Sequence, residues 1–419
     1  MQKSNTIVGI DIGSSFVRTV IAQEMHGEEK PRIIGVGMAA SFGMRRGVIV
    51  DVDDVAKVIN ESVEAAERMA GLAVKSALVS IGGSEISFQG SKGVIAVGRA
   101  DGEVAEDDVT RVIGEAQIIQ RPMNKEIIHV IPCKYRLDDQ DNIKDPVGMK
   151  GVRLEVDALV IEGSASQVKN LTKCVYQAGI EIDDIVLAPL VAAKAVLSKK
   201  QKELGVAMVN MGGGTTSVAV YEEGELLHTA IIPVGAGHIT NDIAIGLRTS
   251  IDTAERIKLE YGMARSNYVD KREEIDLSQI DSQEEGTVSH YHVAEIIEAR
   301  LEEIFELVQK ELKSIGKAGL LPAGIVLSGG GAKMPHIVEM AKDILRLPTQ
   351  IGFPQGFSGV LDRIDDPAFA TAAGLVQWGM EKTDAGVSNA VSGKVMEIFS
   401  HSATGTVDTM RKWMKKFLP

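Results

Sequence analysis

Several features that define common protein classes are scarce in this 419-residue chain. It has two cysteines, Cys133 and Cys174, without C-x-x-C spacing, a pattern typical of a reducing cytosol, and we expect both to serve core packing. Basic residues are outnumbered, and the formal net charge of −13 argues against nucleic acid as a partner. The eight histidines lack metal-ligand spacing.

Long apolar runs are also missing. Asp11 interrupts the first apolar run, so we expect no secretory signal there, and the run from 185 to 197 is broken by Pro189 and Lys194. The chain nevertheless contains 44% hydrophobic residues, enough for sizeable cores. Its length predicts two or more domains.

A glycine-rich turn occurs twice in the chain. The first turn, Gly13–Ser15, and the second turn, Gly212–Thr215, begin 199 positions apart, and each lies between two apolar runs. Glycine allows a ligand to approach the backbone closely, and consecutive N–H groups in such a turn suit phosphate oxygens. The repeat predicts a duplicated chain whose two halves hold a polyphosphate from both sides.

A third glycine-rich segment strengthens this interpretation. An apolar strand pattern from Ile325 runs into Gly329–Ala332, and a helix pattern follows. The chain contains neither the Walker motif G-x-x-x-x-G-K-[ST] nor a strand that enters G-x-G-x-x-G and a helix. Three turns in this order resemble those of the actin, Hsp70 and sugar-kinase superfamily.

The rest of the chain alternates strand and helix patterns, which predicts an α/β fold. Residues 83–162 interrupt the alternation as a compact α+β insert. Within the insert we expect a hairpin over 84–97, a helix over 106–119 and strands over 127–137 and 153–162. In the second half we expect a solvent-facing hairpin or loop over 266–285, and the longest helix over 292–315.

The insert carries the most specific sequence pattern. It contains His129–Pro132, Tyr135–Asp138 and Ile143–Glu155, and Gly246–Gly262 and Ser328–Pro335 follow later. Together these segments resemble the FtsA family of bacterial cell-division proteins over essentially the whole chain. The resemblance implies an α/β, two-lobed, actin-like fold with nucleotide between the lobes and an inserted small α+β domain.

The resemblance also implies a division into subdomains. The first lobe (1A) comprises 1–82, 163–200 and 368–380, and the insert (1C) comprises 83–162. The second lobe (2A) comprises 201–229 and 310–367, subdomain 2B covers 230–309, and a linker over 381–404 precedes an amphipathic helix over 405–419.

ATP and Mg²⁺ are the ligands that the resemblance implies. Asp11 ends the first strand, where a carboxylate can hold Mg²⁺ through water. Glu255 and Lys258 resemble nucleoside contacts of the family, although an ordinary solvated helix face would have the same composition. The implied nucleotide-binding residues are Asp11, Gly13, Ser14, Ser15, Asn210, Gly212, Gly213, Gly214, Thr215, Thr216, Glu255, Lys258, Gly329, Gly330, Gly331 and Ala332.

Two positions depart from the superfamily pattern. Asn210 stands where most related ATPases have Asp, and Ala188 stands where many have a carboxylate before Pro189. A carboxylate that orients water and accepts its proton contributes ~10²–10⁴-fold to rate, and neither an amide nor a methyl group can replace it. We expect ATP to act mainly as a structural ligand with slow hydrolysis.

The family resemblance implies three partners: the C-terminal peptide of FtsZ, further copies of the chain in a protofilament, and an anionic membrane surface. Arg300 is the candidate anchor for the peptide because Arg suits carboxylate pairing; the alternative is an ordinary exposed pair with Glu298 or Glu302. The prediction of self-assembly depends on the family resemblance alone.

The C-terminal segment predicts an interfacial helix. At 100° per residue its apolar side chains fall within an arc of about 140°, with the basic ones on the flank and opposite face. The residues implied at the membrane are Met410, Trp413, Met414, Phe417 and Leu418 with Arg411, Lys412, Lys415 and Lys416. The alternative is a terminal helix docked on the protein itself.

The sequence therefore predicts an ATP-binding adaptor that polymerises and ties FtsZ to the inner face of the cell membrane at the division site. Two alternatives stay open, a pilus-type actin-like adaptor and a slow ATPase or kinase of the same superfamily. Against a kinase, no separate sugar-site pattern is found; against an Hsp70, no substrate-binding domain follows the nucleotide lobes. The basic C-terminal tail argues against the pilus type.

Overall fold

The computed structural model describes residues 5–25, 30–118, 122 and 124–385. The chain forms two compact units. The larger consists of Met1–Phe88, Asn124–Ile128 and Glu162–Gly379, and the smaller is formed mainly by Gln89–Met123 and His129–Ile161. The predicted helix over 405–419 lies outside the described residues.

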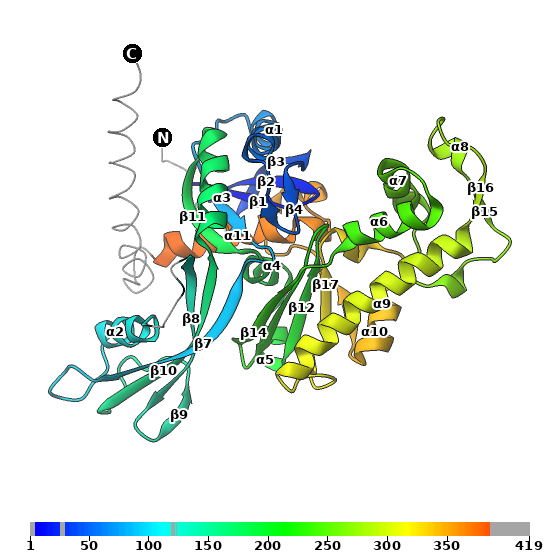
Figure 1. Ribbon diagram of the computed structural model, residues 1–419. Helices are drawn as coiled ribbons and strands as arrows, with labels where there is room; N and C mark the ends of the chain where they lie inside the picture. Colours follow the sequence, from blue (N-terminus) through cyan, green and yellow to red (C-terminus); the bar gives the residue numbers. More distant parts are fainter. Residues whose placement is uncertain (1–4, 26–29, 119–121, 123, 386–419) are drawn as a thin grey trace, which may run out of the picture. The chain divides into compact units, whose positions relative to one another are not determined.

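The larger unit contains two sheets with matching topology (Figure 1). In the first, the strand order is β11-β6-β1-β2-β3-β19, and in the second it is β14-β13-β12-β17-β18. Each begins with an antiparallel three-stranded meander, and parallel strands then extend it beside the first strand of that meander. The duplication that the two turns predict is therefore present in the sheets themselves.

The strands of the two sheets have the following bounds. The first sheet consists of β1 (Thr6–Ile12), β2 (Phe16–Gln23), β3 (Arg32–Ala40), β6 (Ser76–Ile81), β11 (Glu181–Leu187) and β19 (Ser358–Gly359). The second consists of β12 (Val206–Met211), β13 (Thr216–Glu222), β14 (Glu225–Ile232), β17 (Ile325–Ser328) and β18 (Thr349–Ile351).

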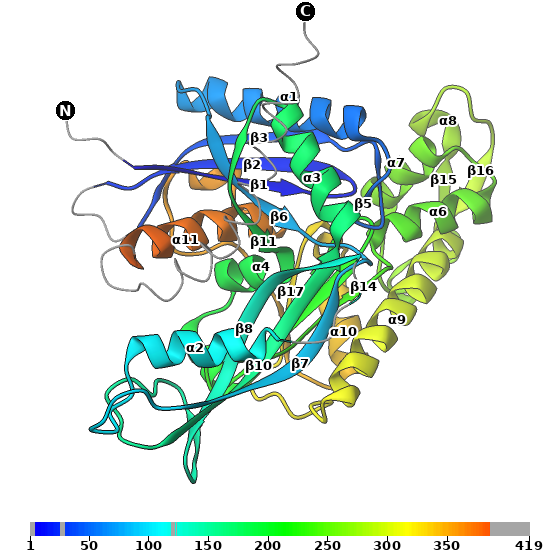
Figure 2. The same cartoon turned by 60° about the vertical axis from the view of Figure 1, so that its left-hand side comes forward.

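Helices cover both faces of the first sheet. Figure 2 shows α1 (Val52–Ala70) above the meander and α11 (Ala370–Ala385) below it. Which face of α1 packs on the sheet is determined by its buried apolar stripe, which includes Val55, Ile59 and Val63. A buried 2.9 Å hydrogen bond between Thr19 and Ser62 adds to this packing. Helices α3 (Ala165–Gln177) and α4 (Ala188–Val196) contact β11 of this sheet, whereas α5 (Lys199–Leu204) contacts β13 of the second sheet.

The second sheet packs on a group of helices from the later half of the chain. These are α6 (Ala236–Leu247), α7 (Ile251–Tyr261), α9 (His290–Ser314) and α10 (Ile337–Leu345). The long helix α9 presents the predicted apolar stripe to this core, where Phe305 is fully buried, although Ile296 stays partly exposed. Burying a side chain of this size contributes about 1.5–3 kcal/mol.

The prediction of a solvent-facing hairpin or loop over 266–285 is wrong in part, because several of its side chains are buried. The segment contains β15 (Glu274–Asp276), which pairs with β16 (Thr287–Ser289), and the short helix α8 (Leu277–Ile280). Its apolar side chains Ile275, Leu277 and Ile280 are buried in the core that contains α9. The few apolar residues spread among many polar ones form no recognisable period, so their burial was not evident from the sequence.

The smaller unit contains most of a four-stranded sheet in the order β7-β10-β8-β9. Its elements are β7 (Ser87–Ala96), α2 (Glu106–Ala116), β8 (Lys125–Leu137), β9 (Gln140–Ile143) and β10 (Arg153–Ser164). The hairpin predicted over 84–97 is wrong, because this segment holds the single strand β7. Gly93 does not turn the chain: a Cβ there would lie 2.0 Å from the Val112 carbonyl oxygen, so glycine lets α2 pack on the strand.

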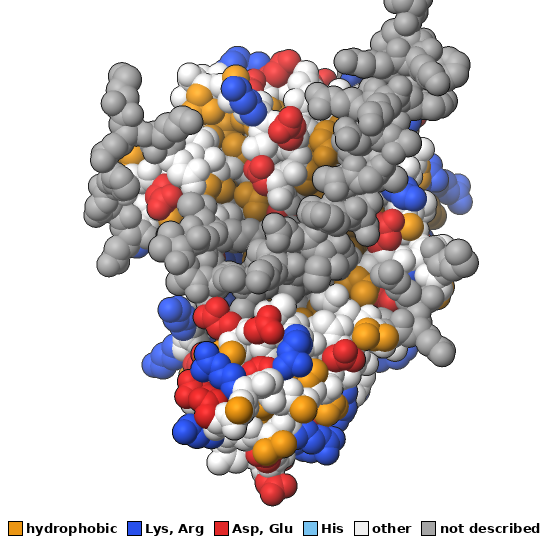
Figure 3. Space-filling view, turned by 90° about the vertical axis from the view of Figure 1, so that its left-hand side faces the viewer, with side chains coloured by type: hydrophobic (Ala, Val, Ile, Leu, Met, Phe, Trp, Pro, Cys, Tyr) orange, Lys and Arg blue, Asp and Glu red, His pale blue; other side chains and the backbone are white. Residues whose placement is uncertain are grey.

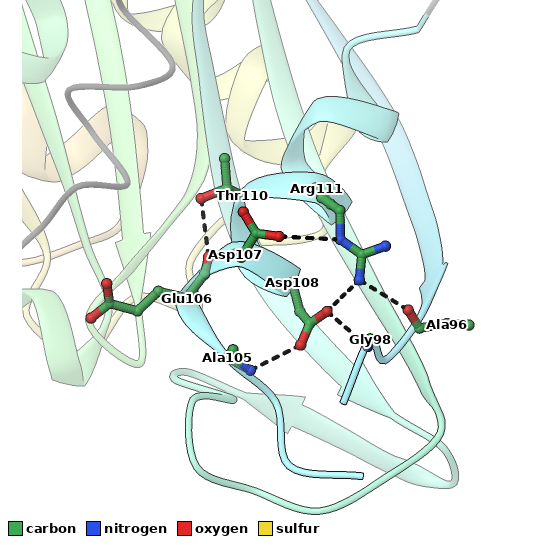
Figure 4. Close-up of polar contacts among 8 residues, drawn as sticks. All are labelled: Ala96, Gly98, Ala105, Glu106, Asp107, Asp108, Thr110 and Arg111. Carbon is green, nitrogen blue, oxygen red and sulfur yellow. Dashed lines mark hydrogen bonds and ion pairs between the residues drawn. The ribbon is translucent and has the colours of Figure 1, made fainter. Parts of the chain in front are cut away.

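A buried carboxylate fixes the start of α2 (Figure 4). Asp108 accepts hydrogen bonds from the backbone N–H groups of Ala105 (2.9 Å) and Gly98 (3.0 Å), and it pairs with Arg111. Burial raises the pKa of Asp108, but these donors outweigh burial and hold the pKa below its usual value. These contacts give a partner to the Ala105 N–H, which has none within the helix, and they set where α2 begins.

The two cysteines differ in burial, and helix α11 is longer than expected. Cys174 is fully buried, as predicted for a packing residue, whereas Cys133 is partly exposed. Helix α11 runs to Ala385, beyond residue 381, where the expected linker begins.

Candidate functional site

The first turn is a tight connection between β1 and β2. The Gly13 N–H donates to the Phe16 carbonyl oxygen at 3.1 Å, and the register of the two strands places Asp11 opposite Arg18. Ser14 Oγ accepts a 2.9 Å hydrogen bond from the Gly47 N–H, so a neighbouring loop holds one hydroxyl of the turn. Ser15 is exposed.

Asp11 lies at the end of β1 and is partly buried. Ser80 Oγ donates to its Oδ1 at 2.8 Å and itself accepts from the Ile12 N–H at 3.2 Å. Burial raises the pKa of the Asp11 carboxyl and outweighs the opposing effects of Arg18 and Ser80. A cation at this carboxylate would favour the ionised form.

The second turn joins β12 to β13 and is held by backbone groups. The Gly212 N–H donates to the Thr215 carbonyl oxygen at 2.9 Å. At the start of α6, the N–H groups of Ala236 and Gly237 donate to the carbonyl oxygens of Gly212 and Gly213, each at 2.8 Å. The first residues of α6 therefore clamp the turn.

The structure brings the two turns together. A Cβ built on Gly213 would lie 1.9 Å from Ser15 Oγ, and one on Gly214 would lie 2.6 Å from Ser14 Oγ. Glycine suits both positions because any side chain there would meet the serine side chains of the first turn. Two sets of N–H groups with the hydroxyls of Ser14 and Ser15 thus converge on one place, which fits a polyphosphate.

The third glycine segment packs on the strand that leads into the second turn. Gly329 has a φ of 81°, and a Cβ on it would lie 2.3 Å from Asn210 Oδ1. The following residues Gly330–Lys333 form a short 3₁₀ helix, and a Cβ on Gly331 would meet the side chain of Met211 at 2.6 Å. The predicted adenosine loop and the second turn are therefore neighbours.

Helix α7 reaches the same loop. The Ala264 N–H donates to the Pro335 carbonyl oxygen at 2.9 Å, and a Cβ on Gly262 would lie 2.8 Å from Met334 Sδ. On α7, Lys258 Nζ donates to Glu255 (2.6 Å) and to Thr240 Oγ1 (2.8 Å). Glu255 and Lys258 thus form one polar cluster on the helix that packs against the loop.

The two departures from the superfamily pattern occupy different surroundings. Asn210 donates a long 3.4 Å hydrogen bond to Thr371 Oγ1 and lies beside Ser328 in the parallel pair of β12 and β17. Ala188 is the first residue of α4, and its methyl lies 3.6 Å from where a Cβ on Gly82 would stand. Neither position carries a carboxylate.

Sequence reasoning missed several residues around the first turn, above all Arg18, Ser80 and Arg46. The guanidinium of Arg18 lies over the rings of Phe16 (5.1 Å) and Phe369 (5.5 Å), and its buried Nε has no hydrogen-bond partner. Arg18 could have been predicted from the strand register, because a turn that closes between Gly13 and Phe16 pairs position 11 with position 18. Ser80 and Arg46 are distant in the sequence and carried no such signal.

The groups present fit Mg²⁺ held together with a phosphate. Among the residues that the structure describes, no group of three or more His, Cys, Asp or Glu side chains could hold a metal ion alone. Mg²⁺ in nucleotide sites typically takes one or two carboxylates and completes its shell with phosphates and water. Asp11 provides such a single carboxylate beside the converging turns.

Arg300 lies on α9, as predicted, but its partners differ from the neighbours that the sequence suggested. Its Nε and Nη2 donate to Asp242 of α6 at 2.6 and 2.9 Å, and Nη1 pairs with Glu303. The bidentate pair with Asp242 ties α9 to α6. The Arg300 guanidinium has five N–H donors, and two of them take no part in these three contacts.

A hollow lies on the smaller unit, lined by residues that include Lys92, Arg136, Asp141 and Asp157. Its charges pair locally, Lys92 with Asp157 at 3.3 Å and Arg136 with Asp141. Figure 3 likewise shows acidic and basic side chains interspersed on one face of the molecule. Because these charges already neutralise one another, the converging turns are the stronger candidate site.

Within the described part of the chain, no helix is both long and apolar enough to cross a membrane. The nine residues implied at a membrane surface lie outside that part.

Similarity to solved structures identifies the fold of this chain. The chain is similar to a chain of the PilM–PilN type IV pilus biogenesis complex (TM-score 0.65, 15% identity, covering 89% of this chain and 98% of that one). It is also similar to MreB5 of Spiroplasma citri bound to ADP (TM-score 0.52, 15% identity, 92% and 99% covered). At these identities the likeness concerns the fold alone, and it confirms the predicted actin-like fold.

Sequence comparisons identify the family. The family described as "Cell division protein FtsA" matches residues 207–374, and the one described as "SHS2 domain inserted in FTSA" matches 83–162. The cell division protein FtsA of Pseudomonas aeruginosa is 36% identical over 415 residues, which cover 99% of both chains. That of Bacillus subtilis is 40% identical over 378 residues, covering 90% of this chain and 84% of the relative. The chain therefore belongs to the FtsA family of cell division proteins.

Proposed function

We propose that this chain binds ATP with Mg²⁺ between the two turns and acts in cell division as a polymerising link between FtsZ and the membrane. The observation that carries the nucleotide proposal is the meeting of the two turns, where Gly213 and Gly214 lie against Ser15 and Ser14. A relative of the same fold, MreB5 of Spiroplasma citri, is bound to ADP, which supports the same ligand class here.

Each element of the site has a role in this proposal. The N–H groups of both turns and the hydroxyls of Ser14, Ser15, Thr215 and Thr216 bind phosphate oxygens, and Gly329–Ala332 lie against the nucleoside. Asp11 holds Mg²⁺ through water, and the ion offsets phosphate charge when bound. Glu255 and Lys258 bind the nucleoside from α7.

We expect slow hydrolysis, because Asn210 and Ala188 supply no carboxylate to activate water. Calorimetry with ATP and Mg²⁺, followed by phosphate release at saturation, tests both parts. Turnover near the enzyme median of ~10 s⁻¹ would contradict the slow reaction. Absence of any nucleotide binding would contradict the site.

The division into subdomains given by the resemblance is part of the proposal, with 230–309 as the FtsZ-docking subdomain 2B. Arg300 is the proposed anchor for the FtsZ C-terminal peptide. Its bidentate pair with Asp242 positions the guanidinium and leaves donors for a carboxylate of the peptide.

The test of this anchor uses two variants. Arg300→Glu should weaken peptide binding while ATP binding persists. The matched variant Asp242→Asn keeps the cation but loses the bidentate pair that positions it, so peptide binding should weaken less than in Arg300→Glu. Unchanged peptide affinity in Arg300→Glu removes Arg300 from the docking site.

The membrane part of the proposal depends on residues 405–419. Each large apolar side chain contributes up to ~1.5–3 kcal/mol when buried, and each Lys or Arg near anionic lipid adds ~1 kcal/mol. Co-sedimentation with anionic vesicles should therefore be reversible and lost in Trp413→Glu with Phe417→Glu, while ATP binding persists. Continued sedimentation of that double variant places the anchor elsewhere.

Self-assembly is proposed as head-to-tail protofilaments, because heterologous contacts that do not close generate filaments. Electron microscopy on a lipid monolayer with ATP should show them. Dispersed monomers at every concentration and nucleotide state would contradict this part.

A further inference from the structure

The loop that holds the first turn has an unusual backbone. It is the hairpin tip between β4 (Met44–Arg45) and β5 (Val48–Ile49), where Arg46 and Gly47 have φ values of 50° and 75°. Two successive positive φ angles are the mark of a type I′ turn, whose first central position favours Asn, Asp or Gly. Arginine is not among the residues that favour this position, so turn formation alone does not account for it.

The strained tip is fixed by contacts on several sides. The Gly47 N–H donates to Ser14 Oγ at 2.9 Å, and Nε2 of the buried Gln167 donates to the Gly47 carbonyl oxygen at 3.1 Å. The Ser84 N–H approaches the Arg46 carbonyl oxygen at 3.4 Å. Strained backbone persists where its surroundings determine it from several directions, and such positions cluster at ligand sites.

Arg46 lies where the two turns meet. Its Cα is 3.0 Å from where a Cβ on Gly214 would stand, while the next residue is bonded to Ser14 of the first turn. The predicted adenosine loop packs instead against Asn210 and Met211, before the second turn. Arg46 therefore lies beside a different part of the second turn from the strand end on which the nucleoside segment packs.

The charge of Arg46 is available for a ligand. Its side chain is exposed, and among the ion pairs of the described residues none includes Arg46. Arg18, by contrast, is influenced by the charges of Asp11 and Asp366 and lies over two aromatic rings. Two arginines thus lie near the first turn, and of these Arg46 is the exposed one.

We propose that Arg46 binds the terminal phosphoryl group of a nucleoside triphosphate held between the two turns, and so makes the site distinguish a triphosphate from a diphosphate. Arginine suits this role because its guanidinium matches phosphate geometry and stays charged. The inference rests on the proposed nucleotide function and deepens it.

The experiment compares two neighbouring arginines of the same hairpin. Arg46→Asn removes the cation and places at position 46 a residue that favours positive φ, so the hairpin is retained. Arg45→Asn is the matched control, since Arg45 is also exposed but has ordinary strand backbone. Dissociation constants for ATP and ADP, both with Mg²⁺, are measured by calorimetry at one salt concentration, and circular dichroism confirms folding.

We expect Arg46→Asn to weaken ATP binding about tenfold or more and ADP binding by less than about twofold, as for loss of one charge-assisted contact. Arg45→Asn should change both by less than about twofold. Equal weakening of ATP and ADP in Arg46→Asn, or an ATP affinity equal to that of the unaltered chain, overturns the inference. If the unaltered chain binds ATP but Arg46→Asn binds it equally well, this inference alone fails; if the unaltered chain binds neither nucleotide, the proposed function fails with it.

Discussion

The two turns have the same place in two similar sheets but are built from different chemistry. In each sheet the turn joins the first two antiparallel strands, and a parallel strand runs beside the first of them. The register pairs Asp11 with Arg18 in one sheet and Asn210 with Ser217 in the other. The first turn therefore carries a carboxylate and a guanidinium, whereas the equivalent positions of the second carry no charge.

The supports of the two turns differ as well. Both turns have backbone hydrogen bonds, but side chains add to them at the first turn, where Ser80 donates to Asp11 and Ser14 accepts from the hairpin tip. At the second turn further backbone groups take this place, since the start of α6 donates to Gly212 and Gly213. The comparison indicates that the first turn supplies charge to the site, and the second supplies a rigid frame of N–H groups.

A substitution at Gly235 should disrupt the rigid frame of the second turn. A Cβ there would lie 2.5 Å from the Gly212 carbonyl oxygen and 2.8 Å from both the Gly213 carbonyl oxygen and the Thr215 nitrogen. These are backbone atoms that cannot rotate away, and overpacking of this kind costs about 1–3 kcal/mol. Gly235→Ala should weaken ATP binding by up to about a hundredfold in calorimetry.

A matched control for this change is Gly90→Ala, where a Cβ meets nothing within 4 Å. ATP binding in that variant should equal that of the unaltered chain. Full affinity in Gly235→Ala would show that the second turn is no rigid frame.

Asp11→Asn makes the first turn resemble the second. The amide cannot replace the carboxylate as a partner for hydrated Mg²⁺, and hydrogen bonds to charged groups contribute about 1.5–3 kcal/mol. The affinity for ATP with Mg²⁺ should fall about thirtyfold, whereas the affinity for ATP with excess chelator should hardly change. Equal losses with and without Mg²⁺ would assign Asp11 a structural role.

Asn210→Asp makes the opposite exchange and gives the second turn a carboxylate. We expect phosphate release to rise about tenfold, short of the ~10²–10⁴ typical of a complete general base, because Ala188 stays a methyl group. The measurement is single-turnover phosphate release at saturating ATP. An unchanged rate would show that slow hydrolysis has another cause.

The smallest expected effect concerns stability. Burial raises the pKa of Asp11 in the folded state, so ionisation costs stability at any pH above the folded pKa, and the cost disappears where both states are protonated. Asp11→Asn should therefore raise the Tm of the ligand-free protein at pH 7.5, by about 1–3 °C. The gain should vanish as the pH falls toward about 4.

Scanning calorimetry across this pH range checks the sign. A lower Tm for Asp11→Asn at pH 7.5 would mean that leaving Arg18 without its opposite charge outweighs the relief of burial.

Much of this protein was evident from local pattern. Apolar periodicity predicted α9 nearly to its ends, and the spacing of glycines predicted the two turns and the third loop. These features are determined by neighbours along the chain, since helix period, strand alternation and turn chemistry act over a few residues. The insert's own motifs were sufficient to indicate the family.

Tertiary structure alone decided the contacts between distant segments. Ser80 lies 69 residues from Asp11, and Arg46 reaches Gly214 of the other half of the chain. Residues 84–97 were interpreted as a hairpin, but Gly93 lies in a single strand on which α2 packs, and Ile275 was interpreted as part of a solvent-facing hairpin or loop, but it enters the core. In each case packing between distant segments determined the role of the residue, and no local preference encodes which distant segment will be the neighbour.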